Sequence, residues 1–147
     1  MVIGGTREFA APRRRVWELL VDPEVLADFL PGVQSLHVED ASHWSAEMRL
    51  PKSPVALTLD FHLVEEQPPE HALLKAAGKR FGASVDVRTA FDLADADGST
   101  AMAWSADIDL GGLLSRFAPA LEPVAQRQAA KFLDDLDRRL RVSPGSR

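Results

Sequence analysis

The chain has 147 residues, of which 46% are hydrophobic and 27% charged, and its formal net charge at pH 7 is −5. This composition indicates one globular domain with a sizeable core and excludes a disordered chain. The acidic balance argues against nucleic acid as a partner, and the absence of cysteine excludes disulfides and thiolate chemistry. The N-terminus lacks the features of a signal peptide and no apolar run could span a bilayer, so we expect a cytoplasmic protein.

The first elements in chain order are a short strand, at about residues 3–10, and two short helices. Pro12 suits the first turn of a helix, where a missing N–H is harmless. In the Asp22-Pro23 pair, the aspartate can cap a second helix that the proline begins. Pro31-Gly32 ends this second helix. Each helix is too short to be stable alone, so both must pack on something larger.

Strict alternation of apolar and polar residues dominates the chain from residue 35 to residue 110. Alternation with one polar face is typical of an antiparallel sheet that is solvated on one side. The breaks are turn sequences at 51–54, 68–69, 78–82 and 97–98. The inward series of the six predicted strands are Leu36 and Val38; Trp44, Ala46, Met48 and Leu50; Val55, Leu57, Leu59, Phe61 and Leu63; Ala72, Leu74, Ala76 and Gly78; Val85, Val87, Thr89, Phe91 and Leu93; and Met102, Trp104, Ala106, Ile108 and Leu110.

After Gly111-Gly112 the apolar period changes to three or four residues, which predicts a long amphipathic helix that ends at Arg141. Pro119 and Pro123 lie near its start, so we expect the first turns to be kinked or separate. A one-sided sheet needs a cover, which the long helix supplies while the two short helices close one end. We expect a single domain at residues 1–142 and a short tail at 143–147.

The order of strand, two helices, six strands and long helix resembles the helix-grip fold of the START-like superfamily, which includes pollen allergens (Bet v 1-like) and polyketide cyclases. The predicted class is therefore α+β, with a seven-stranded antiparallel sheet wrapped on the C-terminal helix. Three segments resemble the G subunit of carbon monoxide dehydrogenase (CoxG), and together they extend the resemblance over essentially the whole chain: FAAPRRRVWELLVDPEVLADFLPGVQSL, WSADIDLGG and LEPVAQRQAAKFLDDLDRRL.

This resemblance implies an accessory role beside a molybdenum hydroxylase such as CO dehydrogenase, and binding of a quinone or a lipid in a cavity. Longer members of the family carry a C-terminal membrane anchor. This chain stops at Arg147 and lacks that extension, so we expect at most a weak peripheral contact with a membrane.

The sequence offers little catalytic chemistry, and we expect no catalytic residue, metal or cofactor. Asp60 and His62 share the polar face of one strand, where a solvated pair is the more usual arrangement than a catalytic dyad, because a working base needs a sheltered site. No histidines have zinc-motif spacing, and the segment DADADGST fails as a calcium loop. There is no phosphate-binding loop or nucleophile elbow.

The distribution of side-chain sizes predicts an apolar cavity between the sheet and the long helix. Large rings at Trp44, Phe61, Phe91 and Trp104 are expected to fill the closed end, and small residues leave space near the loops at 51–54, 79–82 and 111–113. The alternative is that helix side chains fill this space. The predicted ligand-binding residues are Met48, Leu57, Leu59, Ala76, Gly78, Phe81, Val85, Val87, Thr89, Ala106, Ile108, Leu114, Phe117, Leu121, Ala125 and Gln128.

Two polar residues accompany this apolar set. Thr89 is the one polar residue on its inward strand face, where such a threonine more often bonds to nearby backbone than to a ligand. Gln128 lies near the apolar stripe of the long helix and can face inward or lie on its flank. Apolar residues at the mouth, beside Lys79 and Arg80, can touch a membrane or a partner, or fold inward as a lid: Phe81, Leu113, Leu114 and Phe117.

The leading hypothesis is a non-catalytic binding protein that holds a quinone or lipid-like molecule and serves a molybdenum hydroxylase. One alternative is a cyclase or dehydrase that acts on an aromatic polyketide, which would need an inward acid–base group. The other is a structural assembly factor whose core is filled.

Overall fold

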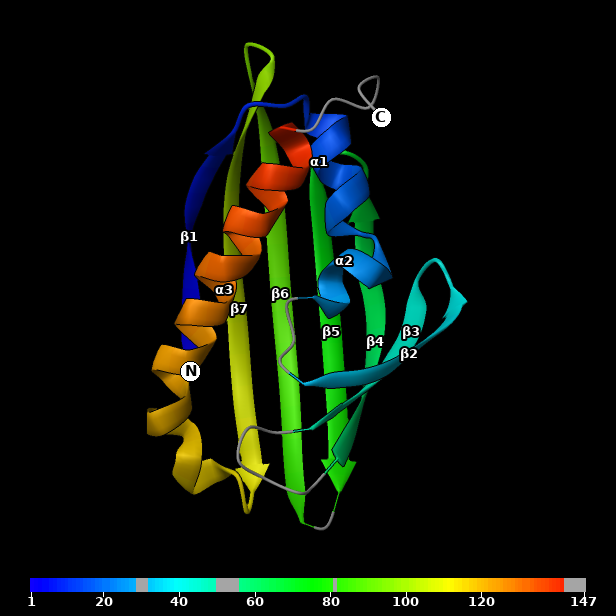
Figure 1. Cartoon of the computed structure of the whole chain (residues 1–147), viewed down its shortest axis with the longest axis vertical. Helices are drawn as coiled ribbons and strands as arrows, with labels where there is room; N and C mark the ends of the chain where they lie inside the picture. The colour runs from blue at the N-terminus through cyan, green and yellow to red at the C-terminus, as the bar shows by residue number, and fades with distance from the viewer. Residues whose placement is uncertain (29–31, 50–55, 81, 142–147) are drawn as a thin grey trace.

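The structure is a computed structural model that describes residues 1–28, 32–49, 56–80 and 82–141 (Figure 1). Its elements in chain order are β1 (Val2–Phe9), α1 (Arg13–Leu20), α2 (Pro23–Ala27), β2 (Val33–Asp40), β3 (His43–Arg49), β4 (Ala56–Gln67), β5 (His71–Arg80), β6 (Ala83–Ala96), β7 (Ser99–Gly112), the 3₁₀ turn η1 (Ser115–Phe117) and α3 (Ala118–Arg141).

The seven strands form one antiparallel sheet in the order β1-β7-β6-β5-β4-β3-β2. Figure 1 shows α3 crossing one face of this sheet over β1 and β7, with α1 and α2 on the same face beside it. The C-terminal end of α3 lies next to α1. This arrangement confirms the predicted helix-grip fold.

The two short helices begin where the local sequence predicts. Asp22 caps α2: its Oδ1 atom accepts a hydrogen bond from the backbone N–H of Glu24 at 2.9 Å, and Pro23 is the first helical residue. Helix α1 begins directly after Pro12. Pro31 of the predicted stop at Pro31-Gly32 lies outside the described residues.

The turn between β6 and β7 also follows from local chemistry. Asp97 and Gly98 both have positive φ angles, 54° and 90°, as the Asp-Gly turn of a tight hairpin requires. Beside this hairpin, the buried hydroxyl of Thr100 donates a hydrogen bond to the carbonyl oxygen of Ala11 at 2.7 Å. This bond joins the hairpin to the link between β1 and α1, so it holds the closed end of the molecule together.

Leu36 and Val38 lie on one face of β2, as predicted, since they pair with the buried residues Ala46 and Trp44 of β3. Val38 is nevertheless 47% exposed. Strand β2 is an edge strand that pairs only with β3, and its register shifts between Val33 and Ser35 and again between Val38 and Asp40. Both shifts lie outside the run from Ser35 to Val38, so the exposure of Val38 follows from its position on the edge strand, which has a neighbouring strand on one side only.

The first turns of the long helix are not separated at its prolines, because Pro119 and Pro123 both lie within one helix, α3. Residues 115–117 form the 3₁₀ turn η1, and α3 then continues from Ala118 through Pro123 to Arg141. All the buried residues of α3 lie from Ala129 onward: Ala129, Phe132, Leu133, Leu136 and Leu140. Among the described residues, none of the helices combines the length and the hydropathy needed to cross a membrane.

Candidate ligand-binding cavity

A cavity of about 210 Å³ lies between the inner face of the sheet and α3. Strands β3 to β7 form one wall, α3 forms the opposite wall, and one residue of α2 closes the side. The described residues that line it are Leu26, Met48, Leu59, Phe61, Leu74, Ala76, Val87, Thr89, Phe91, Trp104, Ala106, Ile108, Leu121, Val124, Ala125, Gln128, Ala129, Phe132 and Leu133.

Small side chains on both walls leave this space. Thr89 of β6 lies directly opposite Ala106 of β7, and Ala76 of β5 lies opposite Val87. On α3, Ala125 and Ala129 are one turn apart and face the sheet, where they pack near Ala106. Because protein interiors are otherwise packed to the density of organic crystals, short side chains that meet on facing elements leave a void unless a larger neighbour fills it.

Ten of the sixteen predicted ligand-binding residues lie around this cavity. They are Met48, Leu59, Ala76, Val87, Thr89, Ala106, Ile108, Leu121, Ala125 and Gln128. The first nine of these come from alternating strand faces and the main apolar stripe of the helix, and the structure also turns Gln128 inward. Contact of these residues with a ligand stays a prediction.

Five predicted residues do not line the cavity, and Phe81 lies outside the described residues. Leu57 and Val85 are buried in solid core and Leu114 packs against it. Gly78 lies tight against β4, since a Cβ atom there would come within 2.5 Å of the Thr58 carbonyl oxygen. Phe117 is 51% exposed and so neither lines nor fills the cavity.

Three of the four large rings that were expected at the closed end also line the cavity: Phe61, Phe91 and Trp104. The register explains this, because the pair Phe91–Trp104 lies one row beyond the pair Thr89–Ala106 on the same face. The alternation of the strands could therefore have identified these rings as cavity-lining residues. The position of Leu26 in the cavity wall could not be identified in this way, because it depends on how α2 packs on the sheet.

The apolar character of the cavity decides what it can do. None of the described lining residues carries a titratable side chain, so this part of the wall can neither hold a proton for transfer nor pair with a charged ligand. Among the described residues there is also no cluster of histidine and carboxylate side chains that could hold a metal ion. The wall suits a neutral, apolar molecule.

The sequence model of one protein family, the G subunit of carbon monoxide dehydrogenase (CoxG), matches residues 5–141. The chain belongs to the CoxG family. Comparison with curated protein sequences gave no match.

Solved structures similar to this CoxG-family chain share its fold at low sequence identity. A conserved protein from Geobacillus kaustophilus is 21% identical, with a TM-score of 0.78 and 95% of each chain covered. Truncated norcoclaurine synthase from Thalictrum flavum is 17% identical, with a TM-score of 0.66, 97% of this chain and 94% of that chain covered. The di-domain ARO/CYC protein BexL of the BE-7585A biosynthetic pathway is 15% identical, with a TM-score of 0.62, 98% of this chain and 51% of that chain covered.

The histidines of this CoxG-family chain lie away from the cavity. His62 was expected to pair with Asp60, but instead its ring stacks on that of His43 with 4.2 Å between the ring centroids. No hydrogen bond joins Asp60 to His62 in the described parts of the chain, and both side chains are exposed. His43 in turn lies with its Nδ1 atom 3.1 Å from a carboxylate oxygen of Asp40. These groups form a solvated surface cluster.

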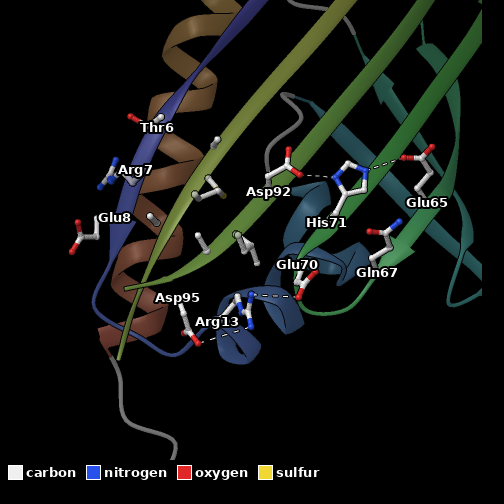
Figure 2. A pocket seen from close by; sticks show the side chains of 15 residues that line it. Thr6, Arg7, Glu8, Arg13, Glu65, Gln67, Glu70, His71, Asp92 and Asp95 are labelled. Carbon is white, nitrogen blue, oxygen red and sulfur yellow. Dashed lines mark hydrogen bonds and ion pairs between the residues drawn. The ribbon is translucent and has the colours of Figure 1, made fainter. Parts of the chain in front are cut away.

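The opposite face of the sheet carries a wide, polar groove of about 970 Å³ (Figure 2). His71 lines this groove, with Nδ1 2.7 Å from a carboxylate oxygen of Asp92 and Nε2 2.9 Å from one of Glu65. The hydrogen bonds to Glu65 and then to Asp92 raise the pKa of His71 above its usual value. Because these bonds connect β4, β5 and β6, the cluster ties neighbouring strands together.

Arg13 of α1 is the second connection in this groove. Its guanidinium lies 3.8 Å from a carboxylate oxygen of Glu70 and 3.9 Å from one of Asp95. The charged groups of the groove thus face one another across short distances, and we assign them a structural role in joining α1 to the two adjacent hairpins.

Proposed function

We propose that the chain is a non-catalytic binding protein that holds an apolar small molecule, a quinone or a lipid-like compound, between the sheet and α3. The observation that carries this proposal is the apolar cavity, whose described lining contains no titratable side chain. A filled structural core would leave no such space, and a catalyst of proton transfer would need an acid or base in it.

The size of the cavity limits the part of the ligand that it encloses. An apolar cavity of about 150 Å³ in another protein binds benzene, so a cavity of about 210 Å³ suits a ring system somewhat larger than benzene. Drug-sized ligands usually occupy about 300–1,000 Å³. A longer molecule would therefore keep its chain outside, between the mouth and solvent.

The first test uses the tryptophans as reporters. 1,4-Naphthoquinone, which quenches indole fluorescence on contact, should quench the fluorescence of the protein saturably, because Trp104 lines the cavity. Trp104→Phe should remove most of this saturable quenching. Trp44 lies beside Phe61 on the neighbouring strand and is not among the residues that line the cavity, so Trp44→Phe is the matched control and should retain it. Equal quenching in both variants would contradict binding at this site.

The second test looks for a ligand carried through purification. Native mass spectrometry of the purified protein should show a bound mass that is lost on denaturation. A protein that is free of ligand and does not bind naphthoquinone would support the alternative of a structural assembly factor.

The partner that we propose is a molybdenum hydroxylase such as CO dehydrogenase, and membership of the CoxG family supports it. A tagged copy of the chain should capture molybdenum hydroxylase subunits from its own cells, and deletion of its gene should lower their activity in extracts. The role would be contradicted if the tagged chain captured no molybdenum hydroxylase subunit and deletion of its gene left the hydroxylase activity unchanged.

A polyketide cyclase is the second candidate, because one similar structure is a di-domain ARO/CYC protein. His62, which the sequence offers with Asp60 as a possible catalytic dyad, lies on the solvated face of the sheet. His62→Ala should therefore leave ligand binding and the melting temperature unchanged. Loss of a measured turnover in this variant, with the fold intact, would favour the cyclase.

We also propose a weak contact between the mouth and a membrane surface. Leu113 is 59% exposed and Phe117 is 51% exposed, and Arg116 lies between them in the sequence. Exposed apolar side chains beside cations suit the interface of an anionic bilayer. Such a contact would place the mouth of the cavity next to the source of an apolar ligand.

A further inference from the structure

We propose that the cavity selects neutral ligands that carry a carbonyl or hydroxyl oxygen, which Thr89 and Gln128 recognise from opposite walls, and that it rejects both plain hydrocarbons and carboxylates. This inference rests on the proposed binding function and adds the chemical class of the ligand. It comes from two polar side chains that have no hydrogen-bond partner among the described residues.

Thr89 is the first of these groups. It lies on β6 with Leu74 of β5 on one side and Ala106 of β7 on the other, and all three side chains line the cavity. A threonine in such a position was expected to bond to nearby backbone. Within the described parts of the chain its hydroxyl makes no hydrogen bond, so its donor and its acceptor remain available to a molecule in the cavity.

Gln128 is the second group, and it comes from the helix wall. It lies between Ala125 and Ala129, which also line the cavity, and its side chain is half-buried. Its amide makes no hydrogen bond to any described residue either. A glutamine amide offers two N–H donors and one acceptor oxygen, so it can pair with a ketone or with an alcohol.

The third group that can hydrogen-bond is the indole of Trp104, which is a donor only. Its Nε1 atom lies towards β1, since a Cβ atom at Gly5 would be 3.6 Å from it. This position is at the β1 edge of the cavity. Thr89 and Gln128 are therefore the groups placed to recognise a ligand from the two main walls.

The selectivity follows from the cost of leaving a polar group without a partner once a ligand covers it. A hydrocarbon that displaces water from the cavity leaves the hydroxyl and the amide unpaired, which costs free energy, whereas a ligand oxygen restores the bonds. A carboxylate would also find hydrogen-bond donors, but none of the described lining residues is a cation that could offset its lost hydration. A neutral oxygen is therefore the group that this wall accommodates best.

The test uses three probes built on one bicyclic skeleton: tetralin, 1-tetralone and 1,2,3,4-tetrahydro-1-naphthoate. Equilibrium dialysis at pH 8 measures their dissociation constants. We expect the wild type to bind tetralone at least about tenfold more tightly than tetralin, and the carboxylate more weakly than either. The hydrophobic effect alone would favour tetralin, so this order is diagnostic.

Two nearly isosteric substitutions should reverse the preference. Thr89→Val and Gln128→Leu remove the hydrogen-bonding groups while they keep most of the volume, and the double variant should bind tetralin more tightly than tetralone. Thr89→Ser keeps the hydroxyl and should keep the selectivity. Ile108→Val is the matched control, because it changes the apolar wall alone and should alter both affinities similarly. Melting temperatures would verify that each variant is folded.

The outcomes separate this inference from the function on which it rests. If the wild type binds tetralin as tightly as tetralone and the double variant behaves identically, the cavity holds ligands but does not recognise oxygen, and the inference is wrong. If the wild type binds neither probe, the binding function itself fails and the inference fails with it. Tight binding of the carboxylate would contradict the predicted rejection of anions.

Discussion

The two halves of α3 differ sharply although they form one continuous helix. The C-terminal part, from Ala129 onward, packs Leu136 and Leu140 against the core and meets α1, whereas the part before Ala129 has no buried residue and contributes Leu121 and Ala125 to a cavity. One half therefore supplies most of the packing free energy of the helix. The other half can carry a binding site because little of the stability depends on it.

This comparison predicts the largest effects for leucine truncations on the two halves. Leu136 is 1% exposed, so Leu136→Ala should lower the free energy of unfolding by about 2–5 kcal/mol. Leu121 already faces empty space, so Leu121→Ala should cost less than about 1 kcal/mol, because the removed atoms had few neighbours. Urea unfolding of both variants measures the difference. Equal losses would show that the two halves are packed alike.

A phenylalanine ring introduced into the cavity should destabilise the protein less than one introduced into the core. Ala106 lines the cavity, so the ring of Ala106→Phe can enter it and should block binding of naphthoquinone with little loss of stability. Ala46 is 1% exposed in solid core, and Ala46→Phe should cost about 1–3 kcal/mol through overpacking. If Ala106→Phe destabilised the protein as much as Ala46→Phe, the cavity would be too small to admit the ring.

The closed end should also respond to pH through His71, which ties β4, β5 and β6 together. Because the folded state raises the pKa of His71, its contribution is fully present below the unfolded pKa of about 6.5 and is lost as the pH rises through the folded value. We expect the wild type to be more stable than His71→Gln by less than about 1 kcal/mol at pH 5.5, and this difference to vanish at pH 9. A difference that grows with pH would have the wrong sign.

The smallest effect on stability is expected at the open end. Leu113→Asp combined with Phe117→Asp should change the free energy of unfolding by no more than about 0.5 kcal/mol, yet it should reduce binding to phosphatidylglycerol vesicles. The matched control is Val38→Asp with Val64→Asp, which replaces two exposed valines elsewhere on the surface. Equal loss of vesicle binding in both double variants would show that the mouth is not the contact.

Local sequence patterns determined most of the fold. The Asp22-Pro23 pair begins α2, Asp97-Gly98 forms the tight turn of the β6–β7 hairpin, and alternation over residues 56–63 places Leu59 and Phe61 inward, as the structure has them. These features depend on backbone preferences and on side-chain period within a few residues. The CoxG family could be inferred in the same way, because its motif segments span the chain.

Tertiary structure alone decided what the cavity is. The volume of the cavity depends on which side chains of α3 face which residues of the sheet. The apolar periods of the strands and of the helix do not encode this alignment, because it joins residues that lie far apart in the sequence. It sets Ala125 and Ala129 opposite Thr89 and Ala106, and the docking of α2 brings in Leu26. The same alignment leaves Thr89 and Gln128 without partners among the described residues, because none of their neighbours there reaches across the empty space to bond with them.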